Sequence, residues 1–345
     1  MNVPLVDLQS QYQNIKSEVD QAINRVLSKG YYVMDQEVNA FEEEWADYCK
    51  AKYCVGVSSC TDALYLTLKA LGVSGQEVIT TPFTFFATTQ AIIASGNHPM
   101  FVDVDETGNL PPMNFGDKVA IPVHLYGRPG EWWLGSKVIE DSAQAHGLPL
   151  SGLAACFSFY PTKNLGAMGQ AGAVVTNDLG LANEIRRLRT YGEMGRFIHY
   201  RLTGNHRMDE LQAAILRAKL PFLYGWNQVR RSLALLYRAR LESISDVIRL
   251  PEDHLQHNYH IFAIRTKDRD SLASCLKEKG IQTSVRYPLP MHLQPALEYL
   301  GYKEGDFPQA EAWARENLSL PIYPEMVYEQ VEYVCEKIKE WARER

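Results

Sequence analysis

The feature of this sequence that most limits its fold is a series of short, continuous apolar runs separated by helical or loop segments. Continuous apolar strands are typical of a mostly parallel sheet whose two faces are both covered by crossover helices. We therefore predict an α/β fold built on one large, mostly parallel sheet. The runs lie at residues 78–79, 100–102, 119–123, 138–139 and 173–175.

Apolar residues recur at helical spacing between and around these runs. One stripe extends from Ile15 to Val26 and ends at Gly30, a typical helix stop. A long helical region at residues 208–241 is interrupted at Pro221, because proline cannot donate the backbone hydrogen bond that a helix interior needs. Further helices are predicted at residues 36–48, 61–71, 87–94 and 181–190.

A smaller unit is predicted after residue 250, where the order of elements changes. A strand at 259–265, a helix at 270–279, a strand at 282–286 and a helix at 329–342 indicate a compact α+β unit. We therefore expect a large domain at residues 1–250 and a small C-terminal domain at residues 251–345.

Two connections in the large domain are unusually short: the one from Gly127 to Lys137 and, nearly as short, the one from Gln144 to Ser158. Nine residues separate Gly127 from Lys137, whereas a parallel crossover normally takes about a dozen or more. We expect a bare loop there, containing Trp132 and Trp133.

The composition argues against several classes of protein. No apolar stretch among the 345 residues approaches the ~18 that a membrane-spanning helix needs. The net charge of −6 and the lack of a basic stripe argue against a nucleic-acid partner. The first residues contain no basic segment followed by an apolar run, so we expect no secretory signal and a cytoplasmic location, with the six cysteines reduced.

An acidic residue follows the apolar strand at 138–139. Asp141 would lie at the carboxyl end of that strand, where parallel-sheet proteins bind ligands. A buried carboxylate is unfavourable there unless a cation pairs with it. Taken alone, Asp141 is better explained as a helix cap.

A lysine follows the next predicted strand, which ends at Pro161. Lys163 precedes a segment rich in glycine, with Gly166, Gly169 and Gly172. Held among apolar residues at the edge of a sheet, the amine would lose hydration, its pKa would fall and it would become nucleophilic. Such an amine is suited to forming an imine with a carbonyl cofactor, although the segment alone is also compatible with a surface lysine.

Small polar residues at 58–61 lead directly into an amphipathic helix. Free N–H groups at a helix start, together with hydroxyls, are suited to binding a phosphate. Aromatic residues at 83–86 then follow a strand, and one of their rings could stack on a planar cofactor. A phosphate cradle, an aromatic ring, a strand-end aspartate and a lysine occur in the order expected for a pyridoxal phosphate site.

The chain resembles the DegT/DnrJ family of pyridoxal-phosphate-dependent sugar-nucleotide aminotransferases, which have the aspartate-aminotransferase-like fold type I. The resemblance extends over essentially the whole chain. It implies that the large domain binds the cofactor. The matching motifs lie at residues 3–8, 41–44, 59–64, 83–85, 123–127, 140–146, 158–166, 204–214 and 287–294.

The resemblance also implies roles for individual residues. Lys163 matches the lysine that forms the imine with the cofactor, and Asp141 matches the carboxylate that keeps the pyridine nitrogen protonated. The other implied cofactor contacts are Gln144 near the ring hydroxyl, Phe85 stacked on the ring, the N–H groups of Cys60 and Thr61 and the hydroxyl of Ser158 on the phosphate, and Asn205 from the neighbouring subunit of a homodimer.

A third set of positions matches residues that contact the sugar nucleotide in similar enzymes. These positions are Gly30, Tyr32, Arg207 and Tyr287. His292 lies in a Pro-x-His-x-Gln pattern typical of members that act on 3-keto sugars. Arg286 stands where such members often carry histidine, and it is a candidate contact for a diphosphate or a carboxylate.

The resemblance implies transfer of an amino group from glutamate to a dTDP- or UDP-linked 3-keto sugar, with pyridoxamine phosphate as the intermediate form of the cofactor. Two alternatives stay open. One is a 4-keto-sugar-nucleotide or cyclitol aminotransferase, and the other is a non-catalytic regulatory protein of the same fold that binds pyridoxal phosphate.

We do not expect a metal site. His254, His257 and His260 are three residues apart, but they lie where a loop enters a predicted strand. Residues at that spacing point to opposite faces of a strand, so the three imidazoles should not share one ion.

Overall fold

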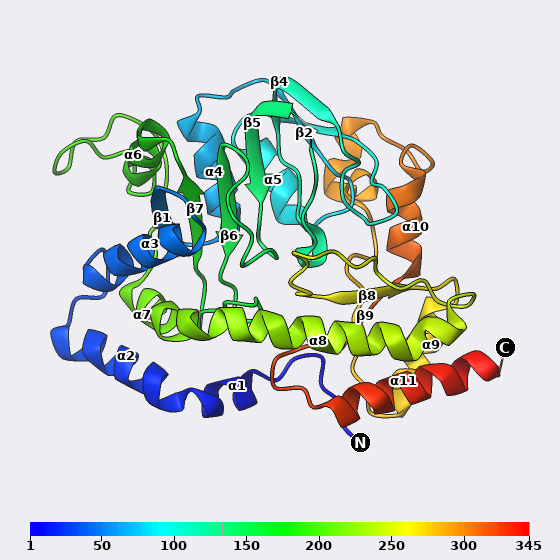
Figure 1. Ribbon diagram of the computed structural model, residues 1–345. Coiled ribbons are helices and arrows are strands. Elements are labelled where there is room, and N and C mark those ends of the chain that lie inside the picture. Colours follow the sequence, from blue (N-terminus) through cyan, green and yellow to red (C-terminus); the bar gives the residue numbers. More distant parts are fainter. Residues whose placement is uncertain (133, 345) are drawn as a thin grey trace.

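The computed structural model describes residues 1–132 and 134–344. Across these residues the main sheet has seven strands in the order β1-β7-β6-β5-β4-β2-β3 (Figure 1). Only β7 runs opposite to the others, and it pairs antiparallel with both β1 and β6. The predicted α/β class with a mostly parallel sheet is confirmed. The strands are β1 (Tyr53–Val57), β2 (Glu77–Thr80), β3 (His98–Phe101), β4 (Asn114–Ala120), β5 (Leu134–Asp141), β6 (Ala154–Ser158) and β7 (Gly172–Thr176).

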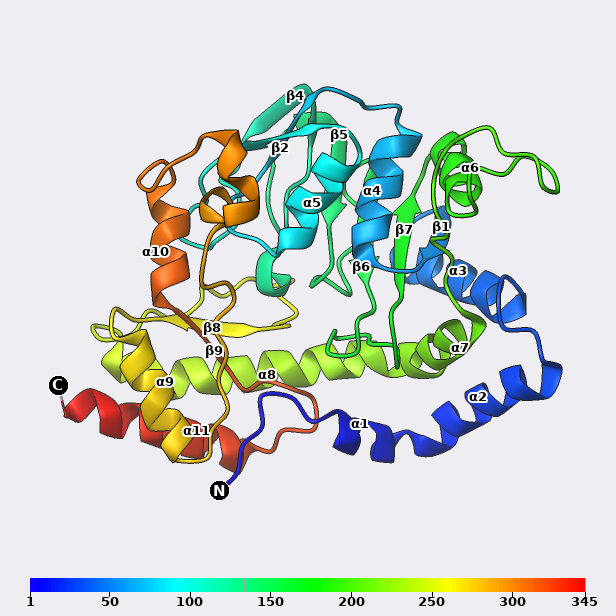
Figure 2. The same ribbon diagram turned by 180° about the vertical axis from the view of Figure 1, so that it is seen from behind.

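Helices cover both faces of this sheet, which explains why its central strands are apolar on both sides. Successive residues of β6 enter different cores, because the pleat turns them to opposite faces: Cys156 packs with one cluster and Phe157 with the other. One face carries α4 (Cys60–Ala70), α5 (Phe86–Ala94) and α6 (Leu179–Leu188), and Figure 2 shows α4 and α5 in front of the sheet. The other carries α3 (Gln36–Tyr48) and α7 (Glu210–Lys219).

The predicted interruption at Pro221 is confirmed. Helix α7 ends at Lys219, a 3-10 turn at Leu220–Phe222 contains the proline, and α8 (Leu223–Leu241) continues from there. Helix α8 extends from the large sheet toward the C-terminal unit (Figure 1). At the N-terminus, α1 (Leu8–Asn14) precedes α2 (Lys16–Lys29), which ends at Gly30 with φ +70°, as its glycine stop predicts.

The C-terminal unit contains a second, small sheet in which β8 (Phe262–Arg265) pairs antiparallel with β9 (Asn317–Leu320). The predicted strand at 282–286 is wrong. The segment forms one isolated bridge, at Ser284, with another at Ile281 just before it, and the Arg286 N–H donates to the Asn317 side chain instead of to a neighbouring strand. Prolines at 288 and 290 also prevent a longer ladder. The helices of this unit are α9 (Arg269–Glu278), α10 (Pro308–Glu316) and α11 (Tyr328–Arg343).

The core of the C-terminal unit draws side chains from several parts of the chain. Val3 from the N-terminal segment and Leu233 and Tyr237 from α8 pack in the same cluster as Phe262 and Val334. The division near Leu250 stays a prediction, and this core contains residues from both sides of it.

The short connection in the large domain contains a 3-10 turn, η1 (Leu125–Gly127), and then a loop from Arg128 to Trp132. Trp133, predicted to be in the same loop, lies outside the described residues. Strand β5 begins at Leu134, earlier than its apolar run at 138–139 predicts. In the described part of the chain no helix has the length and apolar character needed to cross a bilayer.

Candidate active site

Several strand ends meet at one edge of the main sheet. Strands β1, β5 and β6 are parallel to one another and end at Val57, Asp141 and Ser158. Strand β7 starts at the same edge, because its first residue, Gly172, pairs with both Val57 and Ser158. The segments that sequence motifs mark as functional therefore leave the sheet side by side.

A phosphate-sized cradle forms where α4 begins. Ser59 is the N-cap residue of α4, and its hydroxyl accepts the Asp62 N–H at 3.1 Å. The N–H groups of Cys60 and Thr61 are in the first turn, where a helix offers them no acceptor, and the helix dipole favours an anion there.

Gly172 allows the start of β7 to approach this helix end closely. A Cβ atom at position 172 would lie 2.3 Å from the Ser59 carbonyl carbon and 2.7 Å from the Cys60 nitrogen. Any side chain there would displace the backbone of the cradle, so the arrangement requires glycine.

Asp141 is buried at the end of β5, and each of its two carboxylate oxygens accepts a hydrogen bond. Its Oδ2 accepts the Thr88 hydroxyl at 2.7 Å, and its Oδ1 accepts the Ala143 N–H at 3.1 Å. Burial raises the pKa of Asp141, while these two donors and the nearby Lys163 cation act in the opposite direction. The orientation of the carboxylate is therefore fixed, but its negative charge is only partly balanced.

Lys163 lies in the turn after β6, where its backbone N–H donates to the Tyr160 carbonyl at 2.8 Å. Burial lowers the pKa of Lys163 to about 8, and the Arg286 cation adds to the effect, whereas Cys60 and Asp141 oppose it. About a tenth of the amine is therefore neutral at pH 7, far more than at the ordinary lysine pKa of 10.5. The loss of hydration expected from the sequence is therefore present at this lysine.

The Cys60 thiol fills space between these groups. Its Sγ lies 3.4 Å from the Cys156 carbonyl and 3.9 Å from Asp141 Oδ1. Burial, followed by the Asp141 charge, raises the pKa of Cys60 well above its ordinary value. The thiol is thus protonated and apolar in character at neutral pH.

Gln144, Tyr126 and Tyr287 form a connected group beside the cradle. The Gln144 Oε1 accepts the Tyr126 N–H at 2.6 Å, and its Nε2 donates to the Tyr287 hydroxyl at 3.1 Å. The Tyr126 hydroxyl donates to the Arg286 carbonyl. The amide of Gln144 is therefore fixed in orientation by partners from both units of the chain.

An exposed aromatic ring completes this part of the site. Phe85 is 59% exposed although it immediately precedes α5, and its ring centroid lies 5.9 Å from that of Tyr287. An exposed ring at the edge of a buried cluster offers a flat apolar surface to a planar ligand.

The remaining predicted residues lie in three other places. Ser158 is partly buried at the end of β6, and its hydroxyl accepts the Tyr160 N–H at 3.3 Å. His292 is buried, and its Nε2 lies 3.1 Å from Glu311 Oε1. Gly30 and Tyr32 are on the surface at the end of α2.

Asn205 and Arg207 lie beside the start of α4. Arg207 forms a bridge with Val57, and its Nε donates to the Asn205 side chain at 2.8 Å. The residue between them, His206, pairs with Asp62 of α4 at 2.8 Å. Within the described residues, no hydrogen bond or ion pair joins Asn205 or Arg207 to Lys163 or Asp141.

The structure adds two residues that sequence reasoning missed. Thr88 carries no signal of its own, because a threonine in the first turn of a helix is common and its partner is 53 residues away. Tyr126 does have a signal: it lies in the motif at residues 123–127, but its contacts depend on a backbone with φ +59° that the motif does not reveal.

The three histidines considered for a metal have other partners. His257 stacks on Tyr259 with 3.8 Å between ring centroids, and His260 bonds to Asn164 at 3.0 Å. Among residues 1–132 and 134–344, no group of His, Cys, Asp or Glu side chains has an arrangement that would hold a metal ion.

These residues fit pyridoxal phosphate. The cradle has first-turn N–H groups and a glycine that leaves room for an anion, the aspartate and the lysine are close enough to influence each other's pKa, and Phe85 presents a ring to solvent. The N–H groups of the cradle suit a phosphate, the aspartate suits a pyridine nitrogen and the lysine suits an aldehyde.

Comparison with known proteins agrees with this fit. A 369-residue match to a pleiotropic regulatory protein from Geobacillus stearothermophilus is 42% identical and covers 99% of each chain. A dTDP-3-amino-3,4,6-trideoxy-α-D-glucose transaminase from Streptomyces venezuelae is 39% identical, with 99% of this chain and 96% of that protein covered. The crystal structure of S. venezuelae DesV in complex with a ketimine intermediate superposes with a TM-score of 0.92 at 38% identity, covering 99% of this chain and 98% of that one.

The family pattern extends over nearly the whole chain, from residue 13 to residue 339. The fold, the cradle and the lysine–aspartate pair are all contained in that range. The chain belongs to the DegT/DnrJ/EryC1/StrS aminotransferase family and is an aminotransferase that depends on pyridoxal phosphate.

Proposed function

We propose that this aminotransferase moves an amino group from glutamate to a nucleotide-linked 3-keto sugar. The observation that carries the proposal is the Lys163 amine, whose pKa burial lowers to about 8 and which lies close enough to the Asp141 carboxylate for each group to affect the pKa of the other. The Streptomyces relative, named as a transaminase for a dTDP-3-amino sugar, supports the choice of substrate class.

The cofactor, when bound, supplies an aldehyde that captures amines and a ring that accepts electron density. Lys163 would hold the cofactor through its amine. Once free, Lys163 Nζ would be the base that removes the proton from the donor's α-carbon. A base with a pKa near the operating pH is efficient at this step.

The other residues bind and orient. With the cofactor bound, Asp141 would hold a proton on the pyridine nitrogen, and the N–H groups of Cys60 and Thr61 with the Ser158 hydroxyl would bind the phosphate. Gln144 would lie near the ring hydroxyl, and Phe85 would stack on the ring. A protonated ring nitrogen is favoured because Asp141 is buried and, among the described residues, forms no ion pair with an arginine or lysine, so a ring cation would offset its charge.

Substrate binding falls to residues around this centre. We assign the sugar nucleotide to Gly30, Tyr32, Arg207, Tyr287 and His292, and Arg286 to a phosphate or carboxylate. Arg286 lowers the pKa of Lys163, which supports a position close to the reacting atoms.

A homodimer is part of this proposal. The chain exposes apolar side chains in two segments, and exposed apolar patches mark contact surfaces. Leu202 is 96% exposed and Phe197 78%. The others are Tyr31, Tyr32, Val33 and Met34 at the end of α2, and Tyr191, Met194, Ile198 and Tyr200 in the loop before Asn205. A second copy covering this loop would bring Asn205 to the partner's phosphate.

Hybrid dimers test the sharing of sites. Lys163→Ala and Asn205→Ala should each be nearly inactive as pure proteins. If Asn205 acts across the interface, a mixture of the two should regain part of the activity, since one hybrid site has both residues. Sedimentation of the wild-type protein provides the oligomeric state, and a monomer would contradict the proposal.

The reaction itself is tested in two steps. Glutamate added to the cofactor-loaded protein should convert the visible absorption of the bound aldehyde into that of the amine form. The amine-loaded protein should then aminate a 3-keto sugar nucleotide in a panel that also contains 4-keto sugars and cyclitols, with products identified by mass. Amination of only a 4-keto sugar or a cyclitol would reject the 3-keto assignment.

The name of the Geobacillus relative raises a second candidate, a regulatory protein that binds the cofactor without turnover. The glutamate step distinguishes the two, because a protein without turnover would leave the visible absorption unchanged. Borohydride reduction followed by peptide mapping should locate the cofactor on Lys163, and a label elsewhere would refute the role given to that residue.

A further inference from the structure

The residue that follows Lys163 is held by partners from distant segments. Asn164 is 1% exposed, and its Nδ2 donates to Asn227 Oδ1 at 2.9 Å and to the Asn258 carbonyl at 3.3 Å. Its Oδ1 lies 3.0 Å from His260 Nδ1. Asn227 is on α8, whereas Asn258 and His260 precede β8 of the C-terminal unit. These four residues, the Asn–His cluster, hold the turn that carries Lys163 by contacts that span 63 to 96 positions of the chain.

The direction of the bond between His260 and Asn164 follows from the other bonds of Asn164. Because the Asn164 Nδ2 group donates to two partners, its Oδ1 is the acceptor for the imidazole, and we assign the ring proton of His260 to Nδ1. The backbone N–H of His260 donates to Asn258 Oδ1 at 3.0 Å. His260 therefore donates two hydrogen bonds within the cluster, one from its ring and one from its backbone.

The same cluster holds the loop that follows β5. Asn258 Nδ2 donates to the carbonyls of Gln144 at 3.0 Å and His146 at 3.1 Å. Asn227 Nδ2 also donates to the His146 carbonyl, at 2.8 Å. The turn with Lys163 and the loop with Gln144 are therefore fixed relative to each other by one set of side chains.

The backbone of the large domain packs tightly against this cluster at Gly127. The Gly127 carbonyl accepts the Asn258 N–H at 3.1 Å, and a Cβ atom at position 127 would lie 1.7 Å from Asn258 Oδ1. Gly127 also has φ +92°, which a residue with a side chain rarely adopts. The close approach leaves the Asn258 side chain little freedom, so the orientation of the cluster is well defined.

His260 is uncharged in this environment. Burial lowers the pKa of His260 well below its ordinary value. The cations of Lys163, Arg230 and Arg286 lower this pKa further, and Lys163 has the largest effect of the three. A neutral imidazole can therefore support the lysine turn without adding another positive charge near the amine.

We infer that His260 is a positioning residue for the aminotransferase reaction: by donating to Asn164 it fixes the turn that carries Lys163, and with it the place of the lysine amine. This inference rests on the cofactor-binding role proposed for Lys163. The amine has to meet an aldehyde and later a proton on the donor's α-carbon, and a displacement of about 1 Å can cost about 100-fold in rate. The C-terminal unit thus contributes to the position of a lysine that belongs to the large domain.

Borohydride trapping in the cofactor-free protein at pH 7 tests this positioning without relying on turnover. His260→Leu keeps a side chain of similar size but has no donor, and it should slow the attachment of pyridoxal phosphate to Lys163 about tenfold. His260→Asn places an amide donor where Nδ1 stands and should recover most of the rate. In the cofactor-loaded protein, kcat of the glutamate step should fall in the same order, with the KM for glutamate unchanged.

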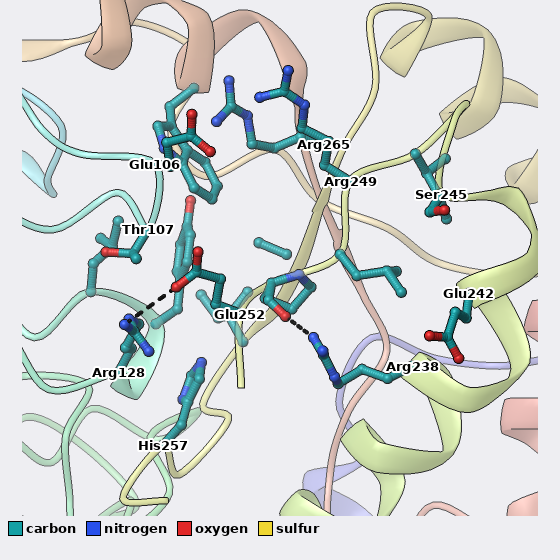
Figure 3. Close-up of a pocket in the computed structure, with 18 residues that line it drawn as sticks. Glu106, Thr107, Arg128, Arg238, Glu242, Ser245, Arg249, Glu252, His257 and Arg265 are labelled. Atoms are coloured by element: carbon teal, nitrogen blue, oxygen red, sulfur yellow. Dashed lines mark hydrogen bonds and ion pairs between the residues drawn. The ribbon is translucent and has the colours of Figure 1, made fainter. Parts of the chain in front are cut away.

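His257→Leu is the matched control. His257 is three residues before His260 and is also buried, but it lines a separate cavity of about 400 Å³ between the large domain and the C-terminal unit (Figure 3). Its ring stacks on Tyr259, and its Nδ1 accepts the Tyr259 N–H at 3.1 Å. This variant should lose stability in denaturant unfolding and keep the wild-type rate of labelling at Lys163.

Two results would overturn the inference, whatever the change in stability. One is a wild-type labelling rate in His260→Leu, and the other is a rate in His260→Asn as slow as that in His260→Leu. If His260→Leu does not fold, Asn164→Ala removes the acceptor of the same bond, and a wild-type labelling rate in that variant would also overturn the inference. A label on a lysine other than Lys163 in the wild-type protein would instead contradict the proposed function, so the two failures are distinguishable.

Discussion

The Thr88 hydroxyl donates a hydrogen bond of 2.7 Å to the buried Asp141 carboxylate, and this contact joins the first turn of α5 to the end of β5. Thr88 is itself fully buried, and its hydroxyl also lies 3.0 Å from that of Thr84. In the proposed site one carboxylate oxygen of Asp141 faces the ring nitrogen of the cofactor. A hydrogen bond to the other oxygen therefore fixes the orientation of the carboxylate.

Replacing Thr88 with valine should therefore impair catalysis without removing Asp141. The Thr88 donor works against the effect of burial on the pKa of Asp141, so its loss should raise that pKa further. We expect kcat to fall by about tenfold, as loss of a hydrogen bond to a charged group implies. Thr88→Ser keeps the hydroxyl and should recover most of kcat. If Thr88→Val had wild-type kcat and wild-type thermal stability, the positioning role would be wrong.

The lowered pKa of Lys163 makes a prediction about pH. In the cofactor-free protein only the neutral amine can attack the aldehyde, and its pKa is about 8 instead of 10.5. The initial rate of borohydride-trapped attachment should rise about tenfold per pH unit below pH 8 and level off above it. Peptide mapping assigns the label, and Lys163→Met should abolish it. A rate that keeps rising to pH 10 would mean that the amine is not desolvated.

Much of this site could be predicted from the sequence because its parts are local. Asp141 and Lys163 each lie within a few residues of a strand end, and parallel strands end at one edge of a sheet. The order of the apolar runs along the chain is therefore enough to predict that Asp141 and Lys163 lie close together, without knowledge of any side-chain contact.

The contacts that the sequence could not predict join distant segments. The Tyr126 hydroxyl reaches the Arg286 carbonyl across 160 positions, and this depends on how the C-terminal unit packs on the large domain. The same packing explains the wrong strand at 282–286: Asn317 takes the Arg286 N–H that a strand partner would have used. Apolar periodicity carries no information about such side-chain acceptors.

Gly172 gives a prediction about the phosphate cradle. Gly172→Ala places a methyl group 2.3 Å from the Ser59 carbonyl carbon, so the start of α4 must move. We expect a loss of stability of about 1–3 kcal/mol and weaker binding of pyridoxal phosphate, measured by denaturant unfolding and by cofactor titration. Gly225→Ala in α8 is the control, since nothing lies within 4 Å of its added Cβ and alanine favours a helix. Equal cofactor affinity in both variants would show that the close approach at Gly172 is unimportant.

His292 leads to a prediction that separates substrate contact from structural support. Its side chain is buried between Glu311, 3.1 Å from Nε2, and the Phe307 ring, 4.8 Å between centroids. Burial would raise the pKa of Glu311, but bonds from the Gly305 N–H and His292 outweigh it and leave the pKa lowered. His292→Ala removes one of these partners and leaves space in a buried region. We expect the free energy of unfolding to fall by about 2–4 kcal/mol. His98→Ala, at an exposed position, should change the free energy of unfolding by no more than about 0.5 kcal/mol.

Kinetics of His292→Gln then test the predicted sugar contact. A raised KM with unchanged kcat and unchanged stability favours the contact. A loss of stability with wild-type KM shows that His292 acts only by supporting the segment at residues 290–294.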